Sequence, residues 1–269
     1  MSRVLLLTST SLRHQYFIHT LCDALDVVGV WREEKSFKPE ETPGTPAEQE
    51  MIRMHFALRN STEEKYFARF AGRSIAKSIT ARDLAPKSIN QEGEVAAMKE
   101  LKPDVVIVFG TGILQEKIIN AFPGNIINLH LGLSPYYRGS GTNFWSLVNN
   151  EPEYVGATIH YLDAGIDSGA MICHARPAIE ADDGPHDLGN KTIIAAIEAL
   201  PLVVSAHSKG VVRAEPQRTD VGKLYLRKDF NGVAVRKLYE NVADGMIPTY
   251  IQNKEVRDKA IRLLPVPRP

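Results

Sequence analysis

Cysteine, long apolar runs and net charge are what this sequence has least of. It contains only two cysteines, Cys22 and Cys173, which are too few for a disulfide framework or a cysteine-based zinc site. No stretch of 18 consecutive apolar residues occurs, so no membrane-spanning segment is expected, and the run from Val4 to Leu7 is too short for the core of a signal peptide. These absences favour a cytoplasmic protein.

The chain also has no excess of positive or negative charge, because 32 Lys and Arg residues balance 32 Asp and Glu residues. The whole molecule therefore has no global field that would collect nucleic acid or anionic membrane. The charges are not spread evenly, since residues 205–269 contain 13 Lys and Arg against 7 Asp and Glu. The carboxyl-terminal segment is mildly basic.

What the chain does contain is an apolar fraction of 43% and a charged fraction of 24%, both ordinary for a globular enzyme. Its 269 residues suit a catalytic domain of about 200 residues with a small appendage. The change in character after the last long helical pattern predicts a catalytic domain over residues 1–205 and a small carboxyl-terminal extension over residues 206–269.

Short apolar strands alternate with helical patterns along the first 205 residues. Apolar runs at 4–8, 27–31 and 105–109 are typical of strands inside a parallel sheet. A helix is expected over 47–71, with a buried stripe of Met51, Met54, Leu58, Tyr66 and Phe67. The order of elements predicts an α/β fold, with a Rossmann-like, mostly parallel sheet flanked by helices.

The segment from Gly124 to Gly169 carries the most informative pattern. Asn128 and His130 alternate with apolar residues, and residues two apart point to the same face of a strand. We therefore expect the amide and the imidazole to project together from a strand end, either as a hydrogen-bonded pair that caps the strand or as part of a site. An acid from the turn Asp163–Asp167 is expected at the end of a neighbouring strand.

These side chains suit the transfer of an acyl-like group to an amine. His130 titrates near neutrality and can accept a proton from an attacking amine. The Asn128 amide can donate a hydrogen bond to an oxyanion, and an aspartate can orient the imidazole. No serine or cysteine lies in a nucleophile-elbow context, so direct transfer without a covalent intermediate is the economical interpretation. No metal site is expected, because a third ligand is lacking.

Four short motifs follow one another along this part of the chain. They are Asn128-x-His130, Ser134-Pro135-Tyr136-Tyr137-Arg138-Gly139, Gly156-Ala157-Thr158-Ile159-His160 and Leu162-Asp163-Ala164-Gly165-Ile166-Asp167-Ser168-Gly169. In type, order and separation they resemble the core of the tetrahydrofolate-dependent formyltransferases. The resemblance is close over residues 100–180 and extends over 1–205 in the order of elements. That family includes methionyl-tRNA formyltransferase, glycinamide ribonucleotide transformylase and the N-formyltransferases of nucleotide-linked amino sugars.

The resemblance implies a catalytic trio of Asn128, His130 and Asp167, in which Asp167 fits the family pattern better than Asp163. It also implies that 10-formyltetrahydrofolate is the formyl donor. The residues expected to wall the pocket for its pterin are Phe109, Gly110, Thr111, Gly112, Ile113, Leu114, Asp163 and Gly165. One departure is that many members carry His-Pro-Ser-Leu-Leu-Pro where this chain has His130 to Pro135, so the role of that family serine does not carry over.

The acceptor amine stays open among the three family substrates. Methionyl-tRNA formyltransferases carry a larger carboxyl-terminal domain, and glycinamide ribonucleotide transformylase lacks such an extension. The small tail therefore favours an amino sugar linked to a nucleotide, with tRNA as a weaker candidate. The residues expected to hold the acceptor are Ser134, Tyr136, Tyr137, Arg138, Gly139 and Ser140, although the Arg138-Gly139 pair could simply shape its loop.

Two alternatives belong to another functional class. One is a hydrolase of formyltetrahydrofolate, which would be expected to carry a regulatory domain before the first strand. The other is a catalytically silent folate-binding module, which should have lost part of the trio. The carboxyl-terminal tail could act as a lid over the acceptor or as the interface of a homodimer, through residues that include Tyr239, Met246, Ile247 and Tyr250.

Overall fold

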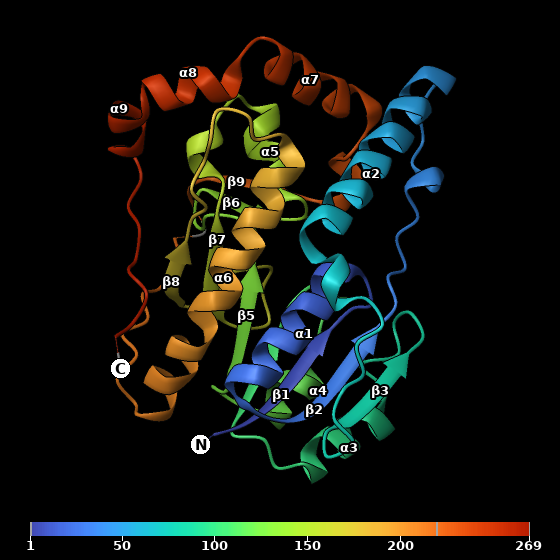
Figure 1. Cartoon of the computed structure of the whole chain (residues 1–269). Helices are drawn as coiled ribbons and strands as arrows, with labels where there is room; N and C mark the ends of the chain where they lie inside the picture. Colours follow the sequence, from blue (N-terminus) through green and yellow to red (C-terminus); the bar gives the residue numbers. More distant parts are fainter. Residues whose placement is uncertain (1, 219, 269) are drawn as a thin grey trace.

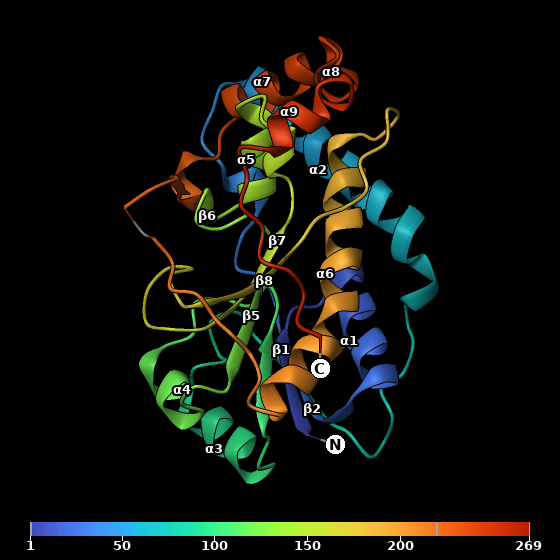
Figure 2. The same cartoon turned by 90° about the vertical axis from the view of Figure 1, so that its left-hand side faces the viewer.

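The computed structural model describes residues 2–218 and 220–268, and its main feature is a seven-stranded sheet (Figures 1 and 2). The strand order is β3-β2-β1-β4-β5-β7-β8. The first five strands in that order are parallel, whereas β7 is antiparallel to β5 and to β8. The strands are β1 (Arg3–Thr8), β2 (Asp26–Glu33), β3 (Thr80–Leu84), β4 (Val105–Val108), β5 (Ile126–His130), β7 (Ala157–Tyr161) and β8 (Met171–Ala175). The predicted α/β fold with a mostly parallel sheet is confirmed.

Helices cover both faces of the sheet, because successive side chains of a buried strand point to opposite sides. From β1, Val4 and Leu6 belong to a core cluster shared with α1 (Leu12–Ala24) and α6 (Pro185–Ser208). Leu5 and Leu7 belong to a second cluster shared with α3 (Glu92–Glu100) and α4 (Glu116–Ala121). Figure 2 shows the two helical layers on opposite sides of the sheet. The fully apolar character of β1 is thus explained by burial on both faces.

Helix α6 is long and apolar enough to cross a membrane, and it is the one such helix in the described residues. In this structure 56% of its apolar window is buried inside the protein. A buried core helix meets the same criteria of length and composition, so α6 is only weak evidence for a membrane segment.

Helix α2 (Pro46–Phe67) lies where a helix was predicted, but two of the five residues of its predicted buried stripe are exposed. Phe67 is buried, whereas Met54 and Leu58 are 41% and 42% exposed. The helix instead buries Ile52, His55 and Glu63, which the apolar pattern had not indicated. Two of these are polar, and each has a partner across the interface: the hydroxyl of Tyr239 for His55 and the guanidinium of Arg13 for Glu63. Partnered polar groups therefore anchor this helix together with the buried apolar side chains of Ile52 and Phe67.

The carboxyl-terminal extension packs onto the body of the protein through a two-stranded sheet and three helices (Figure 1). Its strand β9 (Lys223–Tyr225) pairs in parallel with β6 (Tyr137–Gly139). Met246, Ile247 and Tyr250 are at most 3% exposed, so they are buried inside this chain and are not available as an interface. The boundary predicted after residue 205 falls within α6 and stays a prediction. The remaining elements are α5 (Thr142–Val148), α7 (Gly232–Ala243), α8 (Met246–Gln252), α9 (Lys254–Asp258) and the 3-10 helices η1 (Pro39–Glu41), η2 (Ala68–Phe70), η3 (Pro152–Tyr154) and η4 (Arg227–Asp229).

Two histidines and a tyrosine join α2, α6 and α7. The Tyr239 hydroxyl lies 3.1 Å from Nδ1 of His55 and 3.3 Å from Nε2 of His186. The centroids of the two imidazole rings are 4.6 Å apart. Burial, together with neighbouring positive charge, lowers the pKa of His55 to about 3 and that of His186 to about 4. Both rings are therefore neutral when the protein is folded at neutral pH.

We expect acid to destabilise the protein through this His-Tyr-His cluster. Between pH 6.5 and about 4 the unfolded chain binds protons at both histidines and the folded chain does not, so the free energy of unfolding falls as the pH is lowered. In this window each histidine lowers the free energy of unfolding by up to about 1.4 kcal/mol for every pH unit of acidification. Above about pH 6.5 it has no such effect. Urea unfolding at pH 7.5 and pH 5.5 measures the effect. The double variant His55→Gln/His186→Gln should show a smaller difference between the two pH values, and an unchanged difference would contradict the prediction.

Candidate active site

Asn128, His130 and Asp167 converge at the carboxyl end of β5. The two β5 residues share one face of the strand, as their spacing predicts. Asp167 lies in the turn between β7 and β8, and its Oδ2 is 3.3 Å from Nδ1 of His130. Its Oδ1 is 3.5 Å from Nδ2 of Asn128. One carboxylate therefore connects the amide and the imidazole.

The backbone of Asp167 adopts an unusual conformation that aims its carboxylate at the other two residues. Its φ is +45°, in the left-handed region, where a residue with a side chain costs roughly 1–2 kcal/mol. The backbone N–H of Gly139 donates a hydrogen bond to Oδ2 at 3.1 Å. Burial opposes ionisation of this carboxyl, but His130, His160 and that N–H outweigh it and lower the pKa of Asp167 to about 2. Asp167 is a fixed negative charge at neutral pH.

His130 is 7% exposed and lies between two hydrogen-bond acceptors. Burial lowers its pKa below the ordinary 6.5, although Asp167 opposes that shift. Its Nε2 is 3.3 Å from the carbonyl oxygen of Tyr137, on the other side of the ring from Asp167. The resting imidazole is therefore neutral and able to accept a proton. The imidazolium formed by proton uptake would find an acceptor at each nitrogen.

His160 is the site residue that the sequence reasoning missed. In the antiparallel pairing of β5 and β7, His160 lies directly opposite Asn128. Its Nδ1 is 2.7 Å from the carbonyl oxygen of Tyr161 and must carry the proton, because a carbonyl only accepts. In the neutral tautomer with the proton on Nδ1, Nε2 accepts a hydrogen bond from Nδ2 of Asn128 at 3.1 Å, and it also lies 3.6 Å from Oδ1 of Asp167. The alternation of Thr158, Ile159 and His160 carried a strand signal, but the register with β5 could not be known from it.

The predicted donor pocket after β4 is only partly formed by the residues expected there. Phe109 and Leu114 are 3% and 9% exposed and belong to the core clusters, so their side chains do not wall an open pocket. Ile113 is 84% exposed, and Ile166 in the opposite turn is 49% exposed. Large apolar side chains left uncovered at both walls suit an aromatic ligand. Gly110, with φ +71°, makes room for a neighbouring imidazole where a side chain would overlap it.

The polar residues of these two loops mostly hold the loops themselves. The Thr111 hydroxyl donates to the Gly112 carbonyl oxygen at 2.8 Å. Oδ1 of Asp163 accepts from the backbone N–H of Gly165 at 3.0 Å and from the Ser168 hydroxyl at 2.7 Å. Asp163 thus shapes the turn that presents Asp167, and the structure brings Asp167, not Asp163, to the imidazole.

Two of the residues predicted to hold the acceptor are buried in the loop that follows β5. Ser134 is 0% exposed, and its backbone N–H donates to the Thr158 hydroxyl. Tyr137 is 1% exposed, and its hydroxyl donates to the Glu151 carboxylate. Their side chains are placed to hold the loop in shape and do not face an open cleft.

Of the other four residues of that loop, Arg138 is buried as well, and Tyr136, Gly139 and Ser140 are less enclosed. The Tyr136 hydroxyl accepts a hydrogen bond from the backbone N–H of Arg262. The Arg138 side chain is buried, with 7% exposure, whereas Ser140 is exposed to solvent. Gly139 contributes its N–H to Asp167, as described above. The loop therefore meets the trio through the carbonyl oxygen of Tyr137 and the backbone N–H of Gly139.

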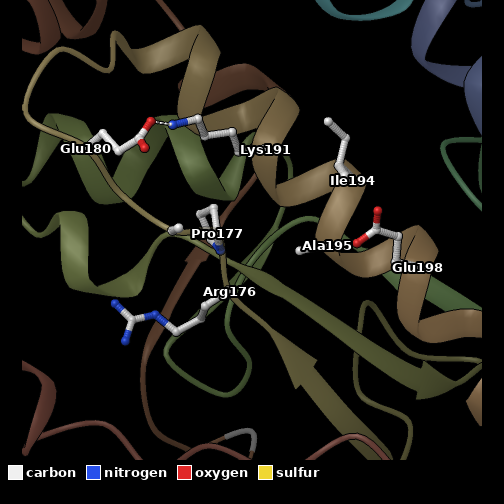
Figure 3. Close-up of a pocket in the computed structure, with 8 residues that line it drawn as sticks. Arg176, Pro177, Glu180, Lys191, Ile194, Ala195 and Glu198 are labelled. Carbon is white, nitrogen blue, oxygen red and sulfur yellow. Dashed lines mark hydrogen bonds and ion pairs between the residues drawn. The ribbon is translucent and has the colours of Figure 1, made fainter.

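A cavity of about 310 Å³ lies apart from these residues, between the end of β8 and the outer face of α6 (Figure 3). Three of the four charged side chains that line it are paired within the protein. Lys191 binds Glu180 and Asp183, and Arg176 binds Asp258. No residue of the trio lines this cavity, so it is not a candidate for the same chemistry.

Comparison with known proteins links the chain to one family. Residues 49–204 match the formyl transferase family. Methionyl-tRNA formyltransferase of Thermodesulfovibrio yellowstonii is 25% identical over 185 residues, which cover 66% of this chain and 59% of that protein. This chain thus spans 59% of the length of that curated relative.

Solved structures share the fold at lower identity. A sugar N-formyltransferase from a Shewanella species is 17% identical, with a TM-score of 0.53, over 86% of this chain and 78% of that one. Phosphoribosylglycinamide formyltransferase from Anaplasma phagocytophilum is 15% identical, with a TM-score of 0.56, over 84% of this chain and 98% of that one. At these identities the likeness concerns the fold alone.

Proposed function

This chain belongs to the formyl transferase family, and we propose that it transfers the formyl group of 10-formyltetrahydrofolate to the primary amine of a small molecule. The observation that carries the proposal is the convergence of Asn128, His130 and Asp167 at one strand end, inside the segment that matches the family. An amide donor, a neutral imidazole and a carboxylate are what direct transfer to an amine requires.

Each residue of the trio has a role that follows from its surroundings. His130 accepts the proton that the amine loses as it attacks the formyl carbon, and returns it to the donor nitrogen N10 as the bond between N10 and the formyl carbon breaks. Asp167 holds the imidazole in place and stabilises the imidazolium. The Asn128 amide donates a hydrogen bond to the formyl oxygen as negative charge develops on it, through the N–H that reaches Asp167 only at 3.5 Å in this structure. His160 orients that amide through the hydrogen bond to its nitrogen.

The donor supplies an activated formyl group, and the loops at Gly110 and Ile166 are placed to hold its pterin. The fit rests on two features of these loops. Ile113 and Ile166 leave apolar surface uncovered on either side, and Gly112 has no side chain to block the approach. The buried side chains of Phe109 and Leu114 support this pocket from beneath.

Among the acceptors we favour an amino sugar linked to a nucleotide. A solved sugar N-formyltransferase shares its fold over 86% of the chain. Methionyl-tRNA is the second candidate, because the curated relative is a methionyl-tRNA formyltransferase. A cytoplasmic location and a homodimer stay predictions from the sequence.

A single assay separates these candidates. The protein is supplied with 10-formyltetrahydrofolate and with nucleotide-linked amino sugars, glycinamide ribonucleotide or charged initiator tRNA, each in a separate reaction. We expect tetrahydrofolate release only in the reactions that contain an amino sugar as the acceptor. Release with only one of the other two would reassign the acceptor, and release without any acceptor would identify a hydrolase. No release in any reaction would contradict the proposed activity.

A further inference from the structure

Four cationic side chains from distant parts of the chain gather beside the carboxyl end of β2. Arg13 and Arg59 both reach the carboxylate of Glu63. Lys35 donates from Nζ to the carbonyl oxygen of Gly110, at the edge of the predicted donor pocket. The guanidinium of the fourth cation, Arg227, comes from the carboxyl-terminal extension and lies over the ring of Phe37, two residues after Lys35.

These cations are not neutralised by the carboxylates around them. Arg13, Arg59 and Arg227 all lie close enough to Lys35 to oppose its charge, and Glu33 is the carboxylate that faces it. Glu33 also accepts hydrogen bonds from two backbone N–H groups, so part of its charge is already engaged. With Glu63 included, four positive groups face two negative ones. The cluster therefore has an excess of two positive charges, which matches the charge of a diphosphate diester.

An aromatic cavity adjoins this cationic cluster. It has a volume of about 410 Å³ and lies between η1 and α2, with Pro39, Phe56 and Ala57 as apolar walls. The guanidinium of Arg59 lies over the Phe56 ring at 4.6 Å and also lines the cavity, so it belongs to both features. The amide of Asn60 lines the cavity as well. Glu40 and Arg53 also line the cavity. Apolar walls with an amide, guanidinium groups and a carboxylate suit a flat heterocycle that carries hydrogen-bonding groups.

The distance from the trio to the cationic cluster suits a single extended ligand. In the sheet, β1 and β4 separate β2 from β5. Three inter-strand spacings amount to about 14 Å between the end of β2 and the end of β5. A sugar ring followed by a diphosphate can extend across a gap of this kind, with its amine at His130 and its base in the aromatic cavity.

We propose that Lys35, Arg59 and Arg227 bind the diphosphate of the acceptor and that the cavity at Phe56 binds its nucleobase. The proposal rests on the proposed formyl transfer, because it names the carrier of the amine at that same site. It also gives the carboxyl-terminal extension a role, since Arg227 lies in the extension and closes one side of the cluster. The acceptor is then a sugar carried on a nucleoside diphosphate.

The test is equilibrium binding of UDP, dTDP, GDP, ADP and inorganic pyrophosphate to the full-length protein by calorimetry. Lys35→Gln should weaken both the preferred nucleotide and pyrophosphate by about tenfold or more, because a charge-assisted hydrogen bond is lost. Phe56→Ala should weaken the nucleotide by about fivefold or more and weaken pyrophosphate less, because it removes the stacking surface for the base while Arg59, which lies over the Phe56 ring, keeps its ion pair with Glu63. Arg69→Gln is the matched control, since Arg69 is an exposed cation next to α2 that lies over Phe70.

Three results would overturn the proposal. The first is that no nucleotide binds, and the second is that Arg69→Gln loses as much affinity as Lys35→Gln. The third is that initiator tRNA binds through Lys35 and UDP does not displace it. The formyl transfer assay keeps this proposal separate from the proposed function. If the protein transfers formyl groups to glycinamide ribonucleotide but binds no nucleoside diphosphate, the proposed formyl transfer stands and the proposed diphosphate site is rejected. Binding with the expected pattern of variants, but without transfer to any acceptor, would sustain the site and reject the activity.

Discussion

Replacing His130 with alanine is expected to lower kcat for formyl transfer by roughly 10²–10⁴-fold, the usual contribution of a general base. The reason is that the attacking amine must lose a proton, and His130 is the neutral base of the trio at that strand end. Its partner Asp167 is ionised and cannot replace it, because the pKa of about 2 makes that carboxylate a weak base. Steady-state kinetics with a verified acceptor measure the loss.

The pH dependence of the same variant gives a second readout. Activity of the wild type should fall on the acid side as His130 becomes protonated, and burial places that fall below pH 6.5. The acid limb that belongs to His130 should be absent from the variant. His19→Ala is a matched control, since it removes a buried imidazole from α1, outside the trio, and should leave kcat unchanged. Near-wild-type turnover in His130→Ala would reject the assignment.

Asn128→Ala should lower kcat by about 10²–10³-fold, or about 2.7–4 kcal/mol, because it removes the donor to the developing oxyanion. The loss should appear in kcat and leave KM nearly unchanged, since the interaction strengthens only in the transition state. Circular dichroism should show an intact fold, because Asn128 is not part of a core cluster. A raised KM with unchanged kcat would instead mean that the amide binds the ground state.

A substitution at His160 should lower kcat less than Asn128→Ala does. His160→Phe keeps a ring of similar shape but removes the nitrogen that accepts from Asn128. The loss of one neutral hydrogen bond corresponds to a decrease in kcat of up to about tenfold, smaller than for Asn128→Ala. If His160 acts only through Asn128, the double variant should be no slower than Asn128→Ala alone. A further decrease would show that His160 contributes separately.

The parts of the structure that could be predicted from the sequence depend on local periodicity. The apolar run of β1 indicated a strand buried on both faces, and it is buried on both. The two-residue spacing of Asn128 and His130 placed both side chains on one face of β5, and they are found there. Side-chain direction along a strand is fixed by the backbone itself, so neighbours in the sequence are enough to know it.

The failures come from contacts between segments far apart in the chain. Met54 and Leu58 had the spacing of a buried stripe, yet they are exposed, because His55 and Glu63 found polar partners on α7 and α1. Phe109 was assigned to a pocket wall and lies in the core, since His14 and Phe17 of α1 pack against its ring. A local pattern does not show which face of a helix or loop a distant segment will cover.

The sequence by itself determined the order of strands and helices and the chemistry of the amide and imidazole pair, because both depend on steric rules within a few residues. Only the tertiary structure decided which partners that pair received. The antiparallel register of β5 with β7 put His160 opposite Asn128, and the left-handed turn at residue 167 brought the carboxylate to His130. The cationic cluster likewise depends on packing, because its members come from α1, the end of β2, α2 and η4. Such contacts are decided by which surfaces bury each other, and that information is spread over the whole chain.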